Sequence, residues 1–469
     1  MSNRRPFRLI VRIVLLLIVL PTPLSWAGDV ELCLSGDRLT LRADGIPLQT
    51  ILRTFSDTGI HVHIDPRINP TITVSIDDEE IQKGLASLLK SLNYSLVWTS
   101  REGPSGSVQT LVEIRIFRPG EWASMRPLVT QRNLVLVSNQ LDGTSFVKNE
   151  ILIELREGMD PQRFEAFLRR IGGSVVGYHA ATKVYRIVLG KDTNIPSLVE
   201  RLADYPGIAT AEPNFVYPIY APVKRDSSSV PSSGATTRVV SKDVAPIAIL
   251  DSGLSRTAGL DELIVTGLNA RNPDEPLTDS LGHGTQMALI AAGVVTPRGV
   301  KRESNTAVPI IPIRIFDDNG YTSNYDLMKS VDFAVANGAR VMSLSWGSET
   351  HSTFLKKTLD YADSKDLIII ASAGNEPTGR PMYPAAYASV IGVGALTPDG
   401  NTWNRSNYGD FVTVYAPGFA TLPVGYKGDP GDYAGTSIAT AFLAHVIAEY
   451  ISKNPEASKE EILAALKTQ

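Results

Sequence analysis

Two kinds of apolar pattern divide the chain. Beyond about residue 241, short runs are apolar at almost every position: IAIL (247–250), IIPIRI (310–315), VMSLS (341–345), LIIIASA (367–373), VIGVGA (390–395) and FVTVYA (411–416). Strands that are buried on both faces read in this way, and they are typical of parallel sheets. Helical spacing lies between several of these runs, as at 326–339 and 353–363. The alternation predicts an α/β domain over residues 241–469, with a doubly wound, mostly parallel sheet.

The first half of the chain has shorter, alternating patterns. Between residues 37 and 120 the expected order is strand, helix, strand, strand, helix, strand, with helical spacing at 48–59 and 79–92. A second unit, residues 145–220, has strand patterns at EILIEL and VYRIVL and two helix patterns that each end at a glycine. Both units are predicted to be small α+β domains. A Ser/Gly/Pro-rich stretch follows, and it predicts a linker over residues 221–240.

The N-terminus has the pattern of a targeting signal. Four arginines precede the apolar run IVLLLIVL, and small residues stand at Ser25 and Ala27. This predicts a signal peptide over residues 1–27, cleaved after Ala27, with an uncleaved anchor as the alternative. The chain is therefore expected to be exported, to the periplasm or the extracellular space. Its one cysteine, Cys33, cannot form an internal disulfide.

Composition narrows the classes of function. The chain has 469 residues, of which 43% are hydrophobic and 20% charged, and its formal net charge is −4. These values are ordinary for a folded soluble protein and argue against wholesale disorder. Nothing in the charge distribution indicates a nucleic-acid surface, so no nucleic-acid partner is expected.

Four polar residues stand at strand ends or helix starts of the α/β domain. Asp251 and Asn375 follow apolar strand runs, and His283 and Ser437 begin helix patterns. Taken singly, the first two read as turn residues, His283 as a loop residue and Ser437 as a helix N-cap. Taken together, a carboxylate, an imidazole, a hydroxyl and an amide supply what acyl transfer needs: orienter, base, nucleophile and oxyanion donor.

The helix that begins near Ser437 has an unusual density of small residues. An N-cap alone requires one Ser or Thr, but Gly435, Thr436, Ala439 and Ala441 are also small. We interpret them as leaving room for a peptide carbonyl to approach the Ser437 oxygen. The partial positive charge of a helix N-terminus would favour an oxyanion there.

These four places carry a family resemblance. The segments AILDSGL, DSLGHGTQMA, ASAGNE and AGTSIATA resemble the four signature blocks of the subtilisin-like serine proteases, the subtilases. The resemblance implies a serine endopeptidase with Ser437 as nucleophile, His283 as general base and then acid, and Asp251 as the residue that orients the imidazole. Asn375, with the N–H of Ser437, would form the oxyanion hole. The alternative hydrolase motif G-x-S-x-G is not present around Ser437.

The resemblance also implies a substrate-binding strand and a first specificity pocket. Substrate would add to the strand at SLSWG, and SAG would form the other wall of the pocket, with Glu376 at its rim. The expected substrates are proteins or peptides, with an apolar residue preferred in the first pocket and Lys or Arg tolerated. Trp346 is expected to narrow the pocket for the fourth substrate residue. The residues implied are Ser345, Trp346, Gly347, Ser372, Ala373, Gly374 and Glu376.

The chain departs from the usual family pattern at a few positions near the motifs. The family usually has Pro and His where Ala441 and Phe442 stand, and His and Gly where Gln286 and Leu289 stand. None of these changes removes a catalytic group. Calcium is common in the family, but no cluster of Asp and Asn strong enough to name as a site is visible, so no cofactor or metal site is assigned.

Both upstream units have resemblances of their own. The segments NEILIEL, GGSVVGYH, VYRIVL and IATAEPNFVY resemble the inhibitor-type propeptide of subtilases, which implies that the protein is made as an inactive precursor; a plain ferredoxin-like binding module is the alternative. The segment LTLRADGIPLQTILRTFSDTGIHVHIDP resembles the short N-terminal domain of secretins and TonB-dependent receptors, which implies docking to an envelope protein. His61 and His63 share a strand face, but two histidines are too few for a metal site.

Two other functions remain compatible with the sequence. The protease fold could serve as a catalytically silent scaffold of an envelope adaptor, or the same triad could act as an esterase or transpeptidase. The intact set of Asp251, His283, Asn375 and Ser437 argues against the silent scaffold.

Overall fold

In this computed structural model the described residues are 30–35, 37–58, 60–103, 106–128, 134–139, 143–190, 192–225, 239–240, 244–256, 259–273, 275–301, 306–425 and 430–467. The predicted signal peptide, residues 1–27, lies outside them, as does most of the predicted linker. Among the described residues, no helix combines the length and the apolar character needed to cross a bilayer. Within the same ranges, no three His, Cys, Asp or Glu side chains are grouped so that they could hold a metal ion.

The C-terminal unit is built on a parallel sheet, as predicted. Its strand order is β16-β18-β15-β20-β21-β22-β23, and every neighbouring pair is parallel. The predicted doubly wound α/β fold is thus confirmed. The strands are β15 (Ile247–Asp251), β16 (Leu268–Asn269), β18 (Ile310–Arg314), β20 (Val341–Leu344), β21 (Ile368–Ser372), β22 (Val390–Leu396) and β23 (Val414–Pro417).

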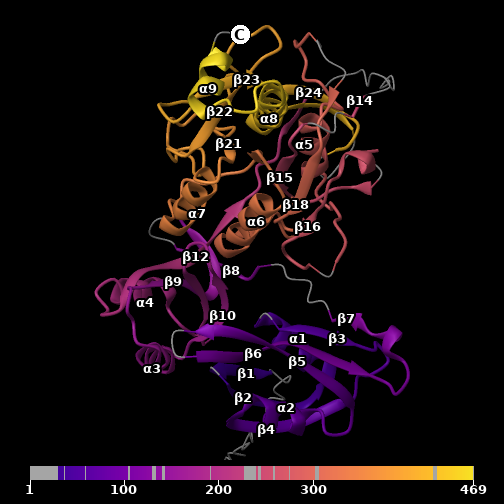
Figure 1. Cartoon of the computed structure of the whole chain (residues 1–469), viewed down its shortest axis with the longest axis vertical. Helices are drawn as coiled ribbons and strands as arrows, with labels where there is room; N and C mark the ends of the chain where they lie inside the picture. The colour runs from indigo at the N-terminus through magenta and orange to yellow at the C-terminus, as the bar shows by residue number, and fades with distance from the viewer. Residues whose placement is uncertain are drawn as a thin grey trace, which may run out of the picture.

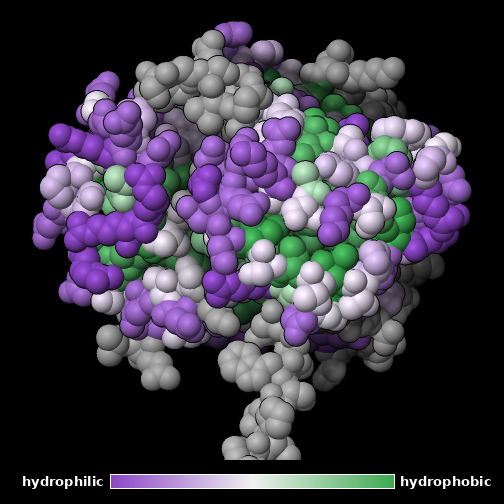
Figure 2. Space-filling model, turned by 90° about the horizontal axis from the view of Figure 1, so that it is seen from below, coloured by the Kyte–Doolittle hydropathy of each residue, from purple (hydrophilic) through white to green (hydrophobic). Residues whose placement is uncertain are grey.

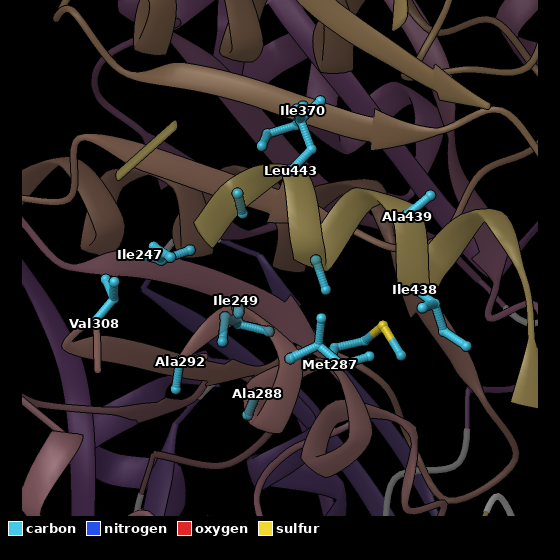
Figure 3. Packing of buried hydrophobic residues seen from close by; sticks show 14 of the residues in the cluster. Ile247, Ile249, Met287, Ala288, Ala292, Val308, Ile370, Ile438, Ala439 and Leu443 are labelled. Carbon is cyan, nitrogen blue, oxygen red and sulfur yellow. The ribbon is translucent and has the colours of Figure 1, made fainter. Parts of the chain in front are cut away.

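Helices cover both faces of this sheet, which explains its continuous apolar runs. In β15, Ile247 and Ile249 face one hydrophobic core, and Ala248 and Leu250 face the other. Helices α5 (His283–Ala291) and α8 (Thr436–Lys453) pack in the first core, where Figure 3 shows Met287 near Ile249. Helices α6 (Asn324–Ala336) and α7 (Thr353–Asp363) pack in the second core, and α9 (Lys459–Lys467) ends the described chain.

The second unit is a small antiparallel sheet with two helices. Its strands are ordered β10-β11-β9-β12, and β8 (Leu136–Ser138) pairs with β9. Helix α3 begins at the N-cap Asp160 and ends at Gly172, which has a left-handed φ of 63°. The expected glycine end of the second helix is wrong, because α4 stops five residues before Gly207, at Leu202. The elements are β9 (Ser145–Leu155), α3 (Pro161–Ile171), β10 (Ser174–His179), β11 (Val184–Val188), α4 (Ile195–Leu202) and β12 (Ile208–Pro218).

The first unit contains the expected order of elements and three further strands, β1, β6 and β7. It has one sheet ordered β1-β2-β4 and another ordered β5-β6-β3-β7, which share a hydrophobic core. Its outer face, at the bottom of Figure 1, shows apolar side chains between hydrophilic ones in Figure 2. The elements are β1 (Glu31–Ser35), β2 (Arg38–Pro47), α1 (Leu48–Asp57), β3 (His61–Ile64), β4 (Thr71–Glu80), α2 (Ile81–Leu88), β5 (Asn93–Gly103), β6 (Gly106–Phe117) and β7 (Arg126–Pro127).

The second and third units are joined by shared strand pairing. The end of β12 leaves its own sheet and pairs with β19 (Tyr321–Ser323) of the C-terminal unit. The start of the predicted linker is also ordered, since β13 (Val223–Arg225) pairs with β25 (Gly431–Ala434), which in turn pairs with β24 (Phe419–Leu422). Residues 221–225 are therefore held against the C-terminal unit, unlike a solvated linker. Further along the chain, β14 (Val239–Val240) pairs with β17 (Thr306–Ala307).

Candidate active site

The candidate residues meet at the point where the strand order of the sheet reverses. The chain runs outward from β15 to β18 on one side and to β20, β21, β22 and β23 on the other. Asp251 is the last residue of β15, and Asn375 follows the end of β21. Ligands of open α/β sheets bind at such a switch point, beyond the carboxyl ends of the strands. The strand order thus puts Asp251 and Asn375 at the edge of the sheet where ligand sites of this fold form.

Asp251 and His283 form a buried pair. The Nδ1 atom of His283 lies 2.7 Å from Oδ1 of Asp251, and both side chains are almost fully buried. The same carboxylate oxygen accepts a hydrogen bond of 2.7 Å from the backbone N–H of Ser252. A carboxylate at Nδ1 fixes the ring orientation and leaves Nε2 as the reactive nitrogen.

Glycines allow helix α5 to approach the end of β15. A side chain on Gly284, which directly follows His283, would collide with the backbone of Gly253. Gly253 itself has φ 125°, which disfavours any other residue, and a Cβ there would strike the carbonyl of Thr278. These contacts explain why the motifs around Asp251 and His283 contain glycine.

Asp279 is a functional candidate that the sequence analysis missed. One of its carboxylate oxygens accepts hydrogen bonds from the Ser252 hydroxyl and the Gly282 N–H, each 2.8 Å long. The other accepts from the N–H and the hydroxyl of Thr285, at 2.8 and 2.6 Å. A carboxylate in this position caps the start of α5 and holds the segment that carries His283. The acidic residue four positions before His283 was the available signal.

Ser437 and Asn375 border the same point in space. A Cβ atom on Gly435 would lie 3.5 Å from each of Ser437 Oγ and Asn375 Nδ2. The side-chain oxygen of Asn375 accepts a 2.9 Å hydrogen bond from the N–H of Thr436, which orients the amide. Among the described residues, Asn375 Nδ2 has no hydrogen-bond partner although it is buried. A buried donor of this kind is free for an oxygen placed beside Ser437.

The interpretation of the small residues in α8 is only partly right. Gly435 does line the approach to Ser437, and Thr436 bonds to Asn375. Ala439 and Ala441, however, are fully buried in the core that α8 shares with α5 and the sheet, and Figure 3 shows Ala439 within that packing. Their small size therefore serves close packing of the helix and does not clear a path for substrate.

Three predicted substrate-binding residues follow β20. The Ser345 hydroxyl donates to the carbonyl of Ser437 at 3.3 Å, and Gly347 lies beside the carbonyl of Tyr383. The Trp346 indole donates to the carbonyl of Leu250 at 3.2 Å and packs against Tyr217. Its side chain is fully buried, so it forms part of the floor beneath the bound segment.

The other predicted wall follows β21. Ser372 and Ala373 are buried, and Gly374, with φ 102°, donates its N–H to the Thr436 hydroxyl at 3.2 Å. Glu376 is exposed. Burial is the main cause that raises the pKa of Tyr220 to about 12, and the negative charges of Glu349 and Glu376 act in the same direction.

Residues that depart from the family pattern are accommodated by local contacts. Gln286 donates from Nε2 to the carbonyl of Val424 at 2.8 Å. Leu289 and Ala441 lie in the hydrophobic core, and Phe442 packs against it. These residues support the helices that carry His283 and Ser437.

A segment of the chain itself occupies the candidate site. After pairing with β19, the chain continues through Ile219, which forms an antiparallel bridge with Trp346. A Cβ atom on Gly435 would lie 3.5 Å from the Cβ of Pro222, the same distance as from Ser437 Oγ. Strand β13 then pairs with β25, immediately before Ser437. Ser437 is only 1% exposed in this arrangement, so its hydroxyl is closed to an external substrate.

The second unit holds this segment in place through contacts with two helices. Glu212 accepts hydrogen bonds of 2.7 Å from the Ser352 hydroxyl and the Thr353 N–H at the start of α7. Asn214 accepts a 3.1 Å hydrogen bond from the N–H of Tyr325 at the start of α6. Both acceptors therefore meet unsatisfied donors of a helix N-terminus.

Family comparisons agree with this division of the chain. The model of the subtilase family matches residues 242–469, and the model of the fervidolysin N-terminal prodomain matches residues 135–214. Neither match includes the first unit. We refer below to the second unit as the prodomain and to the C-terminal unit as the catalytic domain.

Relatives of known identity are similar over the same region. Subtilisin Savinase from Lederbergia lenta is 31% identical over 242 residues, which cover 51% of this chain and 88% of that protein. A thermophilic serine proteinase from Bacillus sp. (strain AK1) is 26% identical over 313 residues, covering 65% of this chain and 78% of that protein. Thermitase from Thermoactinomyces vulgaris is 31% identical over 218 residues, covering 46% and 77%.

A solved structure shares the fold. Fervidolysin from Fervidobacterium pennivorans, described as a keratinolytic enzyme related to subtilisin, superposes with a TM-score of 0.53 over 72% of this chain and 60% of that chain. At 24% sequence identity this likeness bears on the fold alone. Together with the 31% identity across most of Savinase, these matches show that the chain belongs to the subtilase family.

Proposed function

We propose that this chain is the exported precursor of a serine endopeptidase that acts through Asp251, His283, Asn375 and Ser437. Two observations support the proposal: the buried 2.7 Å contact between Asp251 and His283, and the closeness of Ser437 Oγ to Asn375 Nδ2, which has no hydrogen-bond partner among the described residues. Together they supply a base, its orienter, a nucleophile and an oxyanion donor.

Each residue has a defined task in peptide hydrolysis. His283 Nε2 takes the proton of the Ser437 hydroxyl as its oxygen attacks the peptide carbonyl, and Asp251 stabilises the imidazolium that forms. Asn375 Nδ2 and the Ser437 N–H, which lies in the first turn of α8, donate to the developing oxyanion. His283 then gives its proton to the leaving amine, and water releases the acyl group by the same steps in reverse.

Labelling by a fluorophosphonate tests this proposal. The reagent should modify Ser437 in the processed enzyme and leave the Ser437→Ala variant unlabelled. Because Ser437 is covered by the chain's own residues, the uncut precursor should react far more slowly. A processed wild-type protein that stays unlabelled would favour the alternative, a catalytically silent envelope adaptor.

Product analysis separates peptide hydrolysis from related chemistry. With a peptide substrate and an added amine, an endopeptidase yields mainly free carboxylate products. A transpeptidase yields the amide of the added amine, and an esterase cleaves ester analogues but not the peptide. The adjacent peptide segment in the cleft, described above, supports peptides as the substrate class.

Export and docking are parts of the same proposal. The Arg-rich start, the apolar run and the small residues up to Ala27 support cleavage of a signal peptide and delivery to the periplasm or the extracellular space. The separate core and the partly apolar outer face of the first unit support docking to an envelope protein. The N-terminal sequence and the cell fraction of the mature protein in its native host test both points.

A further inference from the structure

The segment that crosses the active site is held on both sides of Ser437. Residues 216–219 are anchored on one side and residues 222–225 on the other, and only Tyr220 and Ala221 lie between the anchors. This arrangement allows the peptide bond that faces the nucleophile to be identified. The inference rests on the proposed function.

The first anchor fixes the acyl side. Val216, Tyr217 and Pro218 pair with β19, and the N–H of Ile219 donates to the carbonyl of Gly320 at 2.9 Å. The side chain of Ile219 packs so closely on Gly320 that a Cβ there would lie 2.8 Å from it. The backbone and the side chain of Ile219 both contact Gly320, so we do not assign this side chain to the first specificity pocket.

The second anchor fixes the leaving-group side. Pro222 is buried beside Gly435, the residue that also borders Ser437 Oγ and Asn375 Nδ2. Val223, Lys224 and Arg225 pair in antiparallel register with Ala434, Tyr433 and Asp432. The guanidinium of Arg225 lies 5.2 Å from the centre of the Phe419 ring. These contacts hold the chain on the leaving-group side of the site.

Only one bond between the anchors suits the chemistry. The bond between Ala221 and Pro222 is a tertiary amide, whose leaving nitrogen belongs to the proline ring. Tyr220 is half-buried and stands between Ile219, which bridges to Trp346, and Ala221, which precedes the Pro222 that lies beside Gly435, so the Tyr220 carbonyl is the one that meets the nucleophile in this register. We propose that the precursor cuts itself between Tyr220 and Ala221.

The reaction balances with the residues present and one water molecule. Ser437 Oγ forms a bond to the carbonyl carbon of Tyr220, and its proton moves to His283 Nε2. The bond from this carbon to the Ala221 nitrogen breaks, and His283 returns the proton to that nitrogen, which becomes a free amine. Water then replaces Ser437 on the carbonyl, so that Tyr220 ends in a carboxylate and the Ser437 hydroxyl is restored.

The proposed cut between Tyr220 and Ala221 also indicates which residue lies beside Trp346, which was expected to narrow the pocket for the fourth substrate residue. Counted back from Tyr220, the fourth residue is Tyr217, which is fully buried with its ring centre 5.6 Å from that of Trp346. In this register Trp346 lies against the fourth residue as an aromatic wall, and how far it narrows the pocket for other residues stays a prediction.

Fragment analysis of the full-length wild-type chain tests the cut directly. Mass measurement should give an N-terminal fragment that ends at Tyr220, and N-terminal sequencing should give a second fragment that begins at Ala221. Asn375→Ala, which should slow each step by about 10²–10³, should accumulate these first products before later trimming. Ser437→Ala should yield neither fragment. A first fragment that begins at any other residue would overturn the assignment.

Matched variants on either side of the bond provide the second test. Ala221→Pro makes the scissile bond a tertiary amide and should abolish the fragment that begins at residue 221, whereas Ala221→Gly should retain it. Tyr220→Asp places a carboxylate opposite Glu349 and Glu376 and should slow the cut at least tenfold, whereas Tyr220→Phe should be cut at close to the wild-type rate. If Ala221→Pro cuts itself at the wild-type rate and gives fragments that end at Tyr220 and begin at residue 221, the assignment is refuted.

Failure of this inference can be told from failure of the proposed function. A wild-type protein that is cut elsewhere but hydrolyses peptides retains the function and loses the assigned bond. A protein that neither cuts itself nor hydrolyses any peptide after its prodomain has been removed loses both.

Discussion

The Nδ1 atom of His283 and the Oδ1 atom of Asp251 lie 2.7 Å apart although the two residues come from different elements, the start of α5 and the end of β15. Both are shielded from water, so the carboxylate acts on the imidazole in a medium of low dielectric constant. The contact depends on the strand order of the sheet and on the glycines that let α5 approach it.

Asp251→Asn should leave the fold intact and reduce kcat strongly. In serine proteases the equivalent change costs about 10⁴ in kcat, because the amide stabilises the wrong imidazole tautomer. A loss of this order in peptide hydrolysis is expected here. Asp360→Asn, which changes an exposed carboxylate paired with Lys356, is the matched control and should retain activity. Equal kcat values for the two variants would remove Asp251 from the orienting role.

Asp279→Asn tests a residue that positions His283 without contacting the bound segment. Loss of the charged cap should let the start of α5 shift, and misplacement of the base should lower kcat by about tenfold to a hundredfold. KM should stay within about twofold of the wild-type value, since the described partners of the Asp279 carboxylate are Ser252, Gly282 and Thr285, none of which belongs to the bound segment. Asp261→Asn is the control. A variant with raised KM and unchanged kcat would contradict the positioning role.

The sequence was informative about elements and motifs because their causes are local. Strands buried on both faces must be apolar throughout, and this requirement revealed the parallel sheet directly. The motifs around Asp251 and His283 carry glycines that backbone contacts demand. Ala439 was misread because small size has two causes, access for substrate and close helix packing, which the sequence alone does not distinguish.

Non-local pairing explains what the sequence did not show. Nothing in the residues from Ala221 to Arg225 indicates that they pair with a strand more than two hundred positions later. The cap supplied by Asp279 was missed because it acts from a loop ahead of the helix, outside the usual N-cap position. The contact of the Trp346 indole with the carbonyl of Leu250 likewise joins residues almost a hundred positions apart, so the sequence does not show it.

A peptide library should show preference for tyrosine or another aromatic residue before the cut and for large aromatic residues at the fourth position. The basis is the proposed register, which puts Tyr220 directly before the cut and Tyr217 at the fourth position, against Trp346. Lys and Arg should be accepted in the first pocket because the carboxylate of Glu376 is expected at its rim. Glu376→Gln should reduce cleavage after Lys relative to Tyr by about two- to fivefold, the value of an exposed charge pair. Glu262→Gln is the control, and cleavage confined to Asp or Glu would contradict this prediction.

Glu212→Ala should weaken inhibition by the prodomain. The carboxylate accepts hydrogen bonds from Ser352 and Thr353 at the start of α7, and bonds to a charged group contribute about 1.5–3 kcal/mol. Prodomain release from the cut complex should therefore accelerate by roughly tenfold to a hundredfold, measured as recovery of peptidase activity after dilution. Glu200→Ala, an exposed change on α4, should release at the wild-type rate. Identical release by both variants would exclude Glu212 as an anchor.

The buried carboxylate of Asp326 should make the stability of the catalytic domain sensitive to acid. Burial alone would raise the pKa of Asp326, but the opposing charges of Arg271 and Lys329 outweigh it and hold that pKa below its usual range. A lowered pKa contributes stability that is complete above about pH 4, the ordinary value for Asp, and that is lost as pH falls below it.

Asp326→Asn tests this contribution by removing the charge at constant size. At pH 7 the variant should unfold more readily by about 3–5 kcal/mol, because Arg271 and Lys329 then lose their buried partner. Its stability should fall less steeply than that of the wild type as pH drops below about 4. Denaturant unfolding should be measured in the Ser437→Ala background, which avoids self-digestion. As the control, Asp360→Asn should lower the free energy of unfolding by no more than about 0.5 kcal/mol. Parallel acid profiles for the wild type and Asp326→Asn would show that this carboxylate does not govern the acid response.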